Sequence, residues 1–349
     1  MRKFFYNLAT DQYPLIFTFP LKIILWIFSL VYLTALWLNH LGFKLGVLRS
    51  HKLPKPVISV GNLTWGGAGK TPFTIFLAEH LKSSHAKTAI LSRGYGGSGN
   101  DNDEVKMMKE YLKDVSVVVG AKRYEAGKAF LKNHSVDMFL LDDGFQHRAL
   151  QRDLNIVLVD ATNPWGNGCL LPCGILREPK SVLRRADIIV LTKVDLAKES
   201  LEKLASEIKA LCPATPIFQA IHRPDKFHDL LKNTDEPLEF LADQRVNALC
   251  SIAQPAAFQA TLEKIKLSVH ERFNFLDHEE YSAGDLKNLI TKTRAEGIST
   301  IITTAKDKVK LEKYFQEFIN QKIKLVSLEI KIEIIHGREE LVQRINRLF

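Results

Sequence analysis

The chain has 349 residues, a formal net charge of +9 and a pI near 9.2, and 46% of its residues are hydrophobic. This length is enough for two domains of ordinary size, each with its own apolar core. The positive charge suits a nucleic acid, an anionic membrane surface or a polyanionic substrate. No run of Lys and Arg with interleaved aromatic residues stands out. We therefore expect no nucleic-acid partner.

The cysteines indicate a reducing compartment. Only two of the four lie close together, and their spacing matches no metal-ligand pattern. We expect reduced thiols of a cytosolic domain. The four positions are Cys169, Cys173, Cys212 and Cys250.

The N-terminal region, residues 1–50, differs from the rest of the chain. Residues 23–38 are almost wholly apolar, a run of about sixteen residues that is shorter than the roughly 20 needed to cross a bilayer. The run contains Trp26, Tyr32 and Trp37, and interfacial aromatics beside basic flanks favour membrane contact. We predict a membrane-associated helix that either spans the bilayer or lies in one leaflet, with a buried soluble helix as the alternative. The flanking basic residues are Arg2, Lys3, Lys44, Arg49, Lys52 and Lys55.

Residues 60–72 have the pattern of a phosphate-binding loop. They follow the apolar run 56–60, precede the helix-like run 73–81, and end in Gly69-Lys70-Thr71-Pro72. A strand, a Gly-rich loop and a helix in this order form a P-loop. The usual spacing places a glycine where this chain has Thr64, while Gly66 and Gly67 lie inside the loop. We therefore predict a variant P-loop, with a chance Gly-rich turn as the alternative.

Each part of this loop has a predicted role at a nucleotide. Glycines let successive N–H groups point at one phosphate, and the helix start adds partial positive charge. Lys70 is expected to reach the β- and γ-phosphates, and Thr71 to offer its hydroxyl to Mg²⁺. The predicted nucleotide-binding residues of the loop are Thr64, Trp65, Gly66, Gly67, Ala68, Gly69, Lys70 and Thr71.

Residues 51–235 alternate between strand-like and helix-like segments. Several of the strand candidates are continuous apolar runs, as expected for strands covered by helices on both faces. We predict an α/β domain of P-loop (RecA-like) type with a doubly wound, mostly parallel sheet and a ligand beyond the carboxyl ends of the strands. The strand candidates after the loop are residues 87–92, 115–119, 136–142, 154–160, 187–193 and 216–220.

Residues 236–349 are predicted to form a second, smaller α/β domain. The polar stretch 222–243 is predicted to be a connection between the two domains. The predicted strands of the second domain are residues 246–252, 267–275, 299–304 and 324–332, and its predicted helices are 256–265, 283–296, a short one after Asp307, and 339–348.

Two carboxylates follow the apolar run 138–141. A strand that ends in acidic residues can deliver a carboxylate to Mg²⁺, which prefers oxygen ligands. Asp142 and Asp143 are the candidates, and a polar turn is the alternative. Gln146 and His147 come next, and either could contact nucleotide or metal or satisfy local backbone groups.

Three further positions could carry chemistry. Arg93 follows the strand 87–92 in a Gly-rich stretch, and its guanidinium suits phosphate. Asp103 and Glu104 precede a helix, where acidic residues are also routine dipole partners. Asp277 and His278 end a strand of the second domain and could orient a proton-transfer group or be structural.

Residues 192–195, Thr-Lys-Val-Asp, follow another apolar strand. They resemble the Asn-Lys-x-Asp element with which GTP-binding proteins read guanine. A membrane-associated P-loop GTPase is therefore an alternative function, although no switch threonine loop can be identified. A non-enzymatic, membrane-anchored nucleotide-binding adaptor is a second alternative.

Together these motifs resemble one family, the tetraacyldisaccharide 4′-kinases of lipid A biosynthesis. Thr64 in place of glycine is also how the family's loop reads. The apolar N-terminus and residues 275–278 extend the resemblance to most of the chain. The motifs that carry it are residues 61–72, 92–96, 142–147, 170–172 and 176–179.

The resemblance implies a reaction and a location. ATP, with Mg²⁺, would phosphorylate the 4′-hydroxyl of a tetraacyl glucosamine disaccharide 1-phosphate at the cytoplasmic face of the inner membrane. Two unequal α/β domains would enclose the active site in a cleft. No obligate protein partner is inferred.

The resemblance also implies residue roles. Asp103 matches the acidic position suspected as catalytic base, with His278 as its partner, and Glu104 would lie near the metal. Lys70 and Arg93 would neutralise phosphate charge. Two motifs depart from the family: Asn102-Asp103-Glu104-Val105 replaces Gly-Asp-Glu-Pro, and residues 304–307 read Thr-Ala-Lys-Asp in place of Thr-Glu-Lys-Asp, where we assign no role.

Overall fold

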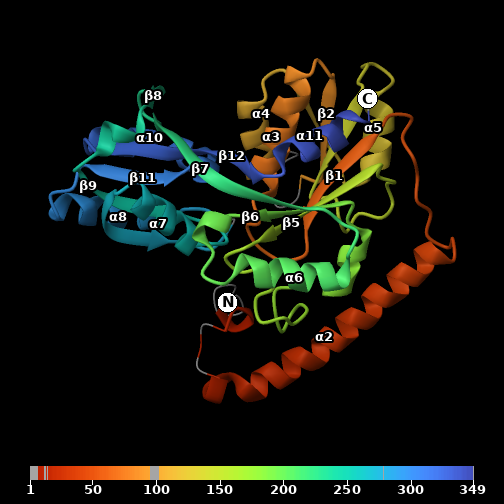
Figure 1. Ribbon diagram of the computed structural model, residues 1–349. Coiled ribbons are helices and arrows are strands. Elements are labelled where there is room, and N and C mark those ends of the chain that lie inside the picture. The colour runs from red at the N-terminus through yellow and green to blue at the C-terminus, as the bar shows by residue number, and fades with distance from the viewer. Residues whose placement is uncertain (1–6, 12, 14, 95–101, 278, 349) are drawn as a thin grey trace. The chain divides into compact units, whose positions relative to one another are not determined.

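The computed structural model describes residues 7–11, 13, 15–94, 102–277 and 279–348. It divides the chain into two compact units, neither of which is continuous in sequence (Figure 1). The first unit comprises Met1–Gly94, Leu112–Ile221 and Ile334–Phe349, and the second comprises Tyr95–Tyr111 and His222–Glu333.

These units differ from the domain boundaries expected after residues 50 and 235. The long strands β7 (Ile217–Asp229) and β12 (Lys324–His336) each begin in one unit and end in the other. A strand keeps the same backbone and residue pattern on both sides of such a change, so sequence cannot locate it. The helix α11 (Arg338–Asn346) therefore lies in the first unit, and α4 (Asp103–Tyr111) lies in the second.

The structure corrects one predicted element. Residues 222–243 are not simply a connection, because β7 continues to Asp229 and pairs in antiparallel fashion with β8 (Thr234–Glu236). The 3₁₀ helix Leu238–Leu241 follows. Polar residues dominate the middle of this strand, residues 222–226, because they are only partly buried or exposed, whereas Phe227 and Asp229 near its end are buried.

The first unit contains the predicted parallel sheet. Its strand order is β7-β6-β5-β1-β4-β2-β3, and all of these pairs are parallel. Every residue of β1, β2, β4 and β6 is buried, which explains their continuous apolar sequences. The bounds are β1 Val57–Asn62, β2 Thr88–Ser92, β3 Ser116–Val119, β4 Met138–Asp142, β5 Leu154–Asp160 and β6 Ile188–Thr192.

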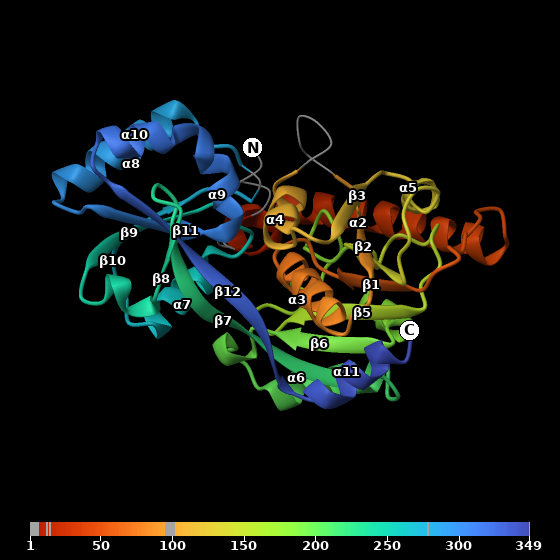
Figure 2. The ribbon, with the colours of Figure 1, turned by 90° about the horizontal axis from the view of Figure 1, so that it is seen from above.

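Helices cover both faces of this sheet, as the doubly wound prediction requires. The helix α3 (Lys70–Ser83) packs on β1 and β4 and buries Phe73 and Leu77. On the other face, α5 (Arg123–Phe130) packs over β2 and β3, and α6 (Leu201–Leu211) buries Leu204 and Ile208 in the core of β5 and β6 (Figure 2). The short 3₁₀ helices Lys180–Arg185 and Val194–Leu196 complete the unit.

Parallel strands bring their carboxyl ends to one edge of the sheet. Five strands in the order β6-β5-β1-β4-β2 end there in Thr192, Asp160, Asn62, Asp142 and Ser92. All five residues are polar and buried. Ligands of open α/β sheets bind beyond this edge, so it is the place to look for a site.

The second unit is also an α/β layer structure, as predicted. Its parallel strands β10-β9-β11-β12 have α7 on one face and α8 on the other, with Phe258 and Leu286 buried beneath them. The remaining bounds are β9 Arg245–Cys250, β10 Ser268–Asn274, β11 Thr300–Thr304, α7 Pro255–Lys264, α8 Ala283–Ala295, α9 Ala305–Leu311, the 3₁₀ helix Glu312–Tyr314, and α10 Phe315–Asn320.

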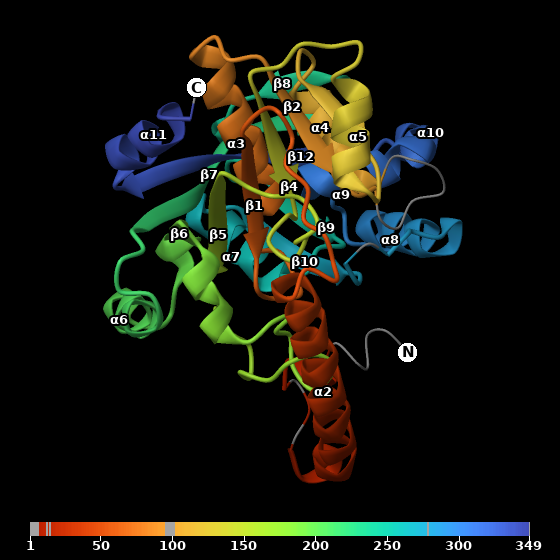
Figure 3. The same cartoon turned by 90° about the vertical axis from the view of Figure 1, so that its right-hand side faces the viewer.

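The N-terminal helix is longer than the predicted apolar run. The helix α2 (Leu15–Lys44) has 30 residues and continues through Pro20 (Figure 3). Its segment Thr18–Lys44 contains an 18-residue window with a mean hydropathy of 2.0 and is long and apolar enough to cross a bilayer by length and composition alone. Large apolar side chains such as Trp26, Phe28 and Val31 are exposed, which argues against a buried core helix.

The close approach of β1 to the turn after β4 predicts the effect of one substitution. A Cβ on Gly61 would lie 2.5 Å from Phe145 Cβ and 2.7 Å from Phe145 N, so backbone would have to shift. We expect Gly61→Ala to lower the free energy of unfolding by about 1–3 kcal/mol, measured in urea. Gly284→Ala is the control, because its Cβ would meet only Ser282 Oγ at 3.7 Å within α8. Equal stability of the two variants would contradict the prediction.

Candidate nucleotide-binding site

The predicted phosphate loop lies where β1 ends and α3 begins. Gly69 is the N-cap residue of α3 with a φ of 84°, a left-handed conformation that glycine adopts without strain. Lys70 and Thr71 form the first turn, where backbone N–H groups have no acceptor within the helix. With the helix dipole, these groups favour an anion at this point.

The side chain of Lys70 is held at the carboxyl edge of the sheet. Its Nζ lies 3.2 Å from Asn62 Oδ1 and 3.6 Å from Asp143 Oδ1. The amide of Asn62 also donates to the carbonyl of Thr64 at 2.9 Å, which ties the loop to the end of β1. A single asparagine therefore positions both the loop and its lysine.

The end of β6 holds the loop from behind. Thr192 Oγ1 donates to the carbonyl of Ala68 at 3.0 Å, and Lys193 Nζ donates to the carbonyl of Gly67 at 2.7 Å. Lys193 is buried and also forms an ion pair with buried Asp160. The C=O of Ala68 and the N–H of Gly69 belong to one peptide and point in opposite directions. Because this C=O faces Thr192, the N–H of Gly69 points away from Thr192.

This contact bears on the alternative of guanine recognition. In the structure, Thr192 and Lys193 support the phosphate loop, whereas Asp195 is exposed. The resemblance of residues 192–195 to a guanine-reading element therefore has a physical explanation that requires no particular base.

The two predicted metal carboxylates have different surroundings. Asp142 is buried at the end of β4, and its Oδ1 accepts the hydroxyl of Thr74 at 3.2 Å. Asp143 has a φ of 48° and receives Arg177 Nη1 at 2.9 and 3.0 Å. Burial alone would raise the pKa of Asp143, but Lys70 and Arg177 outweigh burial and hold that pKa far below its usual value. Asp143 is therefore ionised at neutral pH.

The donor atoms at this edge suit Mg²⁺ bound to a nucleotide. Thr71, Asp142 and Asp143 offer only oxygen, which Mg²⁺ prefers. Within the described ranges no group of three or more His, Cys, Asp or Glu residues could hold a metal. A Mg²⁺ ion here would therefore take its other ligands from phosphate and water, as is usual at nucleotide sites.

Gln146 and His147 follow on the turn after β4. Gln146 Nε2 donates to the carbonyl of Asn62 at 2.9 Å, while its Oε1 is buried and has no hydrogen-bond partner in the described part of the chain. Burial lowers the pKa of His147, and Arg123, Arg152 and Arg93 lower it further, to about 4. The ring is therefore neutral at pH 7 beside an excess of positive charge.

Sequence reasoning assigned no role to three residues at this site: Asn62, Arg123 and Arg177. Asn62 and Arg177 lie inside motifs that carry the family resemblance, so the sequence marked these two positions but indicated no role for them. Arg123 begins α5 and had no signal. It is buried, and its Nε lacks a hydrogen-bond partner among the described residues. Burial and the charge of Arg93 lower the pKa of Arg123, while Asp143 and Asp142 act in the opposite direction.

The second unit holds the predicted acidic pair. Asp103 Oδ2 lies 3.5 Å from Lys310 Nζ, and Lys310 also lies 3.6 Å from Asp307 Oδ1 and contacts Ser251 Oγ. Lys310, Asp307 and Ser251 are all buried. A buried lysine therefore fixes the carboxylate of Asp103 through a network that is itself hydrogen-bonded.

The late motif at residues 304–307 supplies part of this network. Thr304 caps α9 by accepting the N–H of Asp307 at 3.3 Å, and Ser251 Oγ donates to Asp307 at 2.6 Å. Lys306 Nζ lies 2.8 Å from Asp277 Oδ1. Burial alone would lower the pKa of Lys306, but Asp277 and Glu104 outweigh it and raise that pKa. His278 lies outside the described residues.

The predicted residues therefore fall into two groups. The first unit brings together residues 64–71, Asp142, Asp143, Gln146 and His147, with Arg93 exposed at the end of β2. The second unit holds Asp103 and Glu104 on the first turn of α4.

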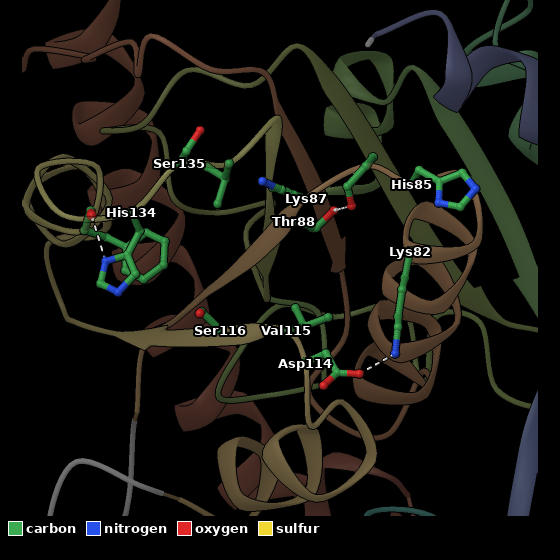
Figure 4. Close-up of a pocket in the computed structure, with 12 residues that line it drawn as sticks. Lys82, His85, Lys87, Thr88, Asp114, Val115, Ser116, His134 and Ser135 are labelled. Carbon is green, nitrogen blue, oxygen red and sulfur yellow. Dashed lines mark hydrogen bonds and ion pairs between the residues drawn. The ribbon is translucent and has the colours of Figure 1, made fainter.

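A separate pocket of about 390 Å³ contains none of these residues (Figure 4). It lies where β2 and β3 begin, and its lining includes Thr88, Ser116 and His134. Lys82 at its rim is paired with Asp114 at 2.5 Å. This is the opposite end of the strands from the phosphate loop, so we do not assign it to nucleotide.

Comparisons with known proteins show to which family the chain is similar. A model of the family described as "Tetraacyldisaccharide-1-P 4'-kinase" matches residues 21–349. The tetraacyldisaccharide 4'-kinase of Syntrophus aciditrophicus is 36% identical over 317 residues, which cover 84% of this chain and 85% of that protein. The protein of the same name from Halothermothrix orenii is 32% identical over 359 residues and covers 93% of both chains.

One solved structure is similar over nearly its whole length. The crystal structure of "apo" form LpxK from Aquifex aeolicus in complex with ATP superposes with a TM-score of 0.72 at 32% sequence identity. The match covers 94% of this chain and 99% of that one. The similarity therefore includes both units.

The pKa of His147 predicts a dependence of stability on pH. Its folded-state pKa of about 4 lies below the unfolded value of about 6.5, so the folded protein binds fewer protons between these values. The contribution of neutral His147 to the free energy of unfolding is therefore complete above pH 6.5 and is lost as the pH falls toward 4. When the pH is lowered from 7 to 5, we expect the free energy of unfolding of the unsubstituted chain, measured in urea, to fall by about 1–2 kcal/mol more than that of His147→Gln. Parallel curves for the two proteins would contradict the assigned pKa.

Proposed function

The chain belongs to the tetraacyldisaccharide-1-P 4'-kinase family, and from this membership we propose that it transfers the γ-phosphate of ATP to the 4′-hydroxyl of a tetraacyl glucosamine disaccharide 1-phosphate in lipid A biosynthesis. The observation that supports the proposal most strongly is the phosphate loop with Lys70 beside Asp143, in a chain similar throughout to an LpxK in complex with ATP.

The nucleotide side of the reaction needs positioning and neutralisation of charge. The N–H groups of the first turn of α3 and the ammonium of Lys70 bind the phosphates. Arg93 and Arg123 add positive charge, which also lowers the pKa of His147. Thr71, Asp142 and Asp143 would hold Mg²⁺, which supplies charge neutralisation on the β- and γ-phosphates. Glu104 is the further carboxylate assigned to the metal.

The acceptor side needs a base for the sugar hydroxyl. We assign this role to Asp103, whose carboxylate is held by Lys310. A carboxylate can accept the proton of the sugar hydroxyl as that hydroxyl attacks phosphorus. His278 is assigned as the partner of Asp103 on the family resemblance alone.

The substrate and α2 together support a location. A tetraacylated sugar resides in a bilayer, and α2 exposes a long apolar surface. Basic residues at its C-terminal end and beyond, such as Lys44 and Arg49, suit anionic headgroups. We assign the protein to the cytoplasmic face of the inner membrane, where ATP is present. We assign no protein partner.

The test is an assay with labelled ATP and the disaccharide lipid, run in parallel with GTP. We expect label to move from ATP to the sugar. Lys70→Ala should lower kcat/KM about 100- to 1000-fold, because a cation aimed at the transferring group is lost. Lys82→Ala is the matched control: it is an exposed lysine of the same helix, and we expect full activity. Tight GTP binding without lipid phosphorylation would favour the GTPase alternative, and full activity of Lys70→Ala would remove its assigned role.

The role of Asp103 is tested separately. Asp103→Asn keeps the shape of the side chain but cannot accept a proton, so kcat should fall about 100-fold or more while the Kd for ATP stays unchanged. Glu110→Gln on the same helix is the control, because Glu110 is exposed and its ion pair is with Lys308, whereas Asp103 is held by Lys310. A normal kcat for Asp103→Asn, measured with saturating lipid, would exclude Asp103 as the base.

A further inference from the structure

Residues 169–178, which we call the bridge segment, contact α2 on one side and the phosphate loop on the other. We propose that Ser29 and Tyr32 of α2 are positioning residues for the nucleotide: through the bridge segment they set the phosphate loop and the pair Arg177–Asp143. This inference rests on the proposed ATP site and concerns what holds that site in place.

The contacts with α2 come from one face of the helix. Ser29 Oγ lies 2.9 Å from the carbonyl of Leu170 and accepts the N–H of Cys173 at 3.2 Å. One turn later, Tyr32 Oη donates to the carbonyl of Arg177 at 2.8 Å. Positions 25, 29 and 32 share a helix face, and Leu25 and Ser29 are buried there. Figure 3 shows the yellow-green loops of this region beside α2.

The bridge segment is itself hydrogen-bonded. The N–H of Leu171 donates to the carbonyl of Leu176 at 2.9 Å, the N–H of Leu176 donates to Cys169 at 3.1 Å, and the N–H of Gly174 donates to Leu170 at 2.9 Å. A segment closed by three internal bonds transmits a displacement at one side to the other side.

The contacts with the phosphate loop come from the end of the bridge segment. The N–H of Trp65 donates to the carbonyl of Ile175 at 2.6 Å, and the N–H of Arg177 donates to the carbonyl of Leu63 at 2.7 Å. Thr64 and Leu176 form an antiparallel bridge between these bonds. The entrance of the phosphate loop is therefore paired with the bridge segment as a short strand.

Arg177 joins all three parts. Its carbonyl accepts Tyr32, its N–H bonds Leu63, and its guanidinium holds Asp143, which lies 3.6 Å from Lys70. When the hydroxyl of Tyr32 is lost, this carbonyl loses its contact with α2 and the backbone of Arg177 is less constrained. The expected result is weaker nucleotide binding, an indirect effect that reaches the site through the backbone of Arg177.

The test uses the full-length protein in detergent and two hydroxyl deletions, Tyr32→Phe and Ser29→Ala. Each substitution removes hydrogen bonding, and such a loss typically changes an equilibrium constant by a few-fold to about tenfold. The Kd and KM for ATP should therefore rise about three- to tenfold. The KM for the lipid acceptor and binding to phospholipid vesicles should not change. Thr34→Ala is the matched control, because the exposed hydroxyl of Thr34 donates to the carbonyl of Leu30 within α2, and it should leave the KM for ATP unchanged.

The outcomes separate this inference from the proposed function. If the unsubstituted protein binds no ATP, the proposed function fails. If it binds ATP, and Tyr32→Phe, Ser29→Ala and Thr34→Ala all bind it equally, the positioning role is refuted. A rise in the KM for ATP that is matched by the same rise in the KM for lipid would also refute it, because α2 would then act on the whole protein. A rise confined to ATP, at an unchanged Tm, supports it.

Discussion

The carboxylate of Asp143 lies between the cations of Lys70 and Arg177, and the rest of the candidate site depends on this arrangement. Asp143 is partly withdrawn from water, which raises its pKa, and the two nearby cations outweigh this effect and keep it charged. In return it fixes the direction of Lys70 at the end of β1 and the position of Arg177 in the bridge segment. An anion placed before α3 then meets a lysine that is already held in position.

This arrangement is possible because the sheet is parallel. The ends of β1 and β4 are neighbours, so Asn62 and Asp142 meet at one edge although about eighty residues separate them. The end of β6 reaches the same edge and supports the phosphate loop through Thr192 and Lys193. Three separate strand ends thus hold one loop, which explains why a loop with Thr64 in place of glycine keeps a defined backbone.

The helix α2 is attached to the same arrangement. In the first unit α2 does not stand apart from the globular body, because polar side chains of one face are hydrogen-bonded to the bridge segment. Its other face is apolar and exposed. One helix can therefore serve a lipid surface on one side and the nucleotide site on the other, which suits an enzyme whose two substrates come from the bilayer and from water.

The sequence by itself determined the parallel α/β fold, most strand positions, the phosphate loop and its lysine, because continuous apolar runs and a Gly-Lys-Thr turn have local physical causes. It located neither the change of unit within β7 and β12 nor the strand character of residues 222–229, because those depend on which neighbours bury a strand. Only the tertiary structure showed that Asn62 and Arg177 position Lys70 and Asp143, and that Lys310 holds Asp103. These contacts join residues far apart in the chain, and no local pattern records a distance in space.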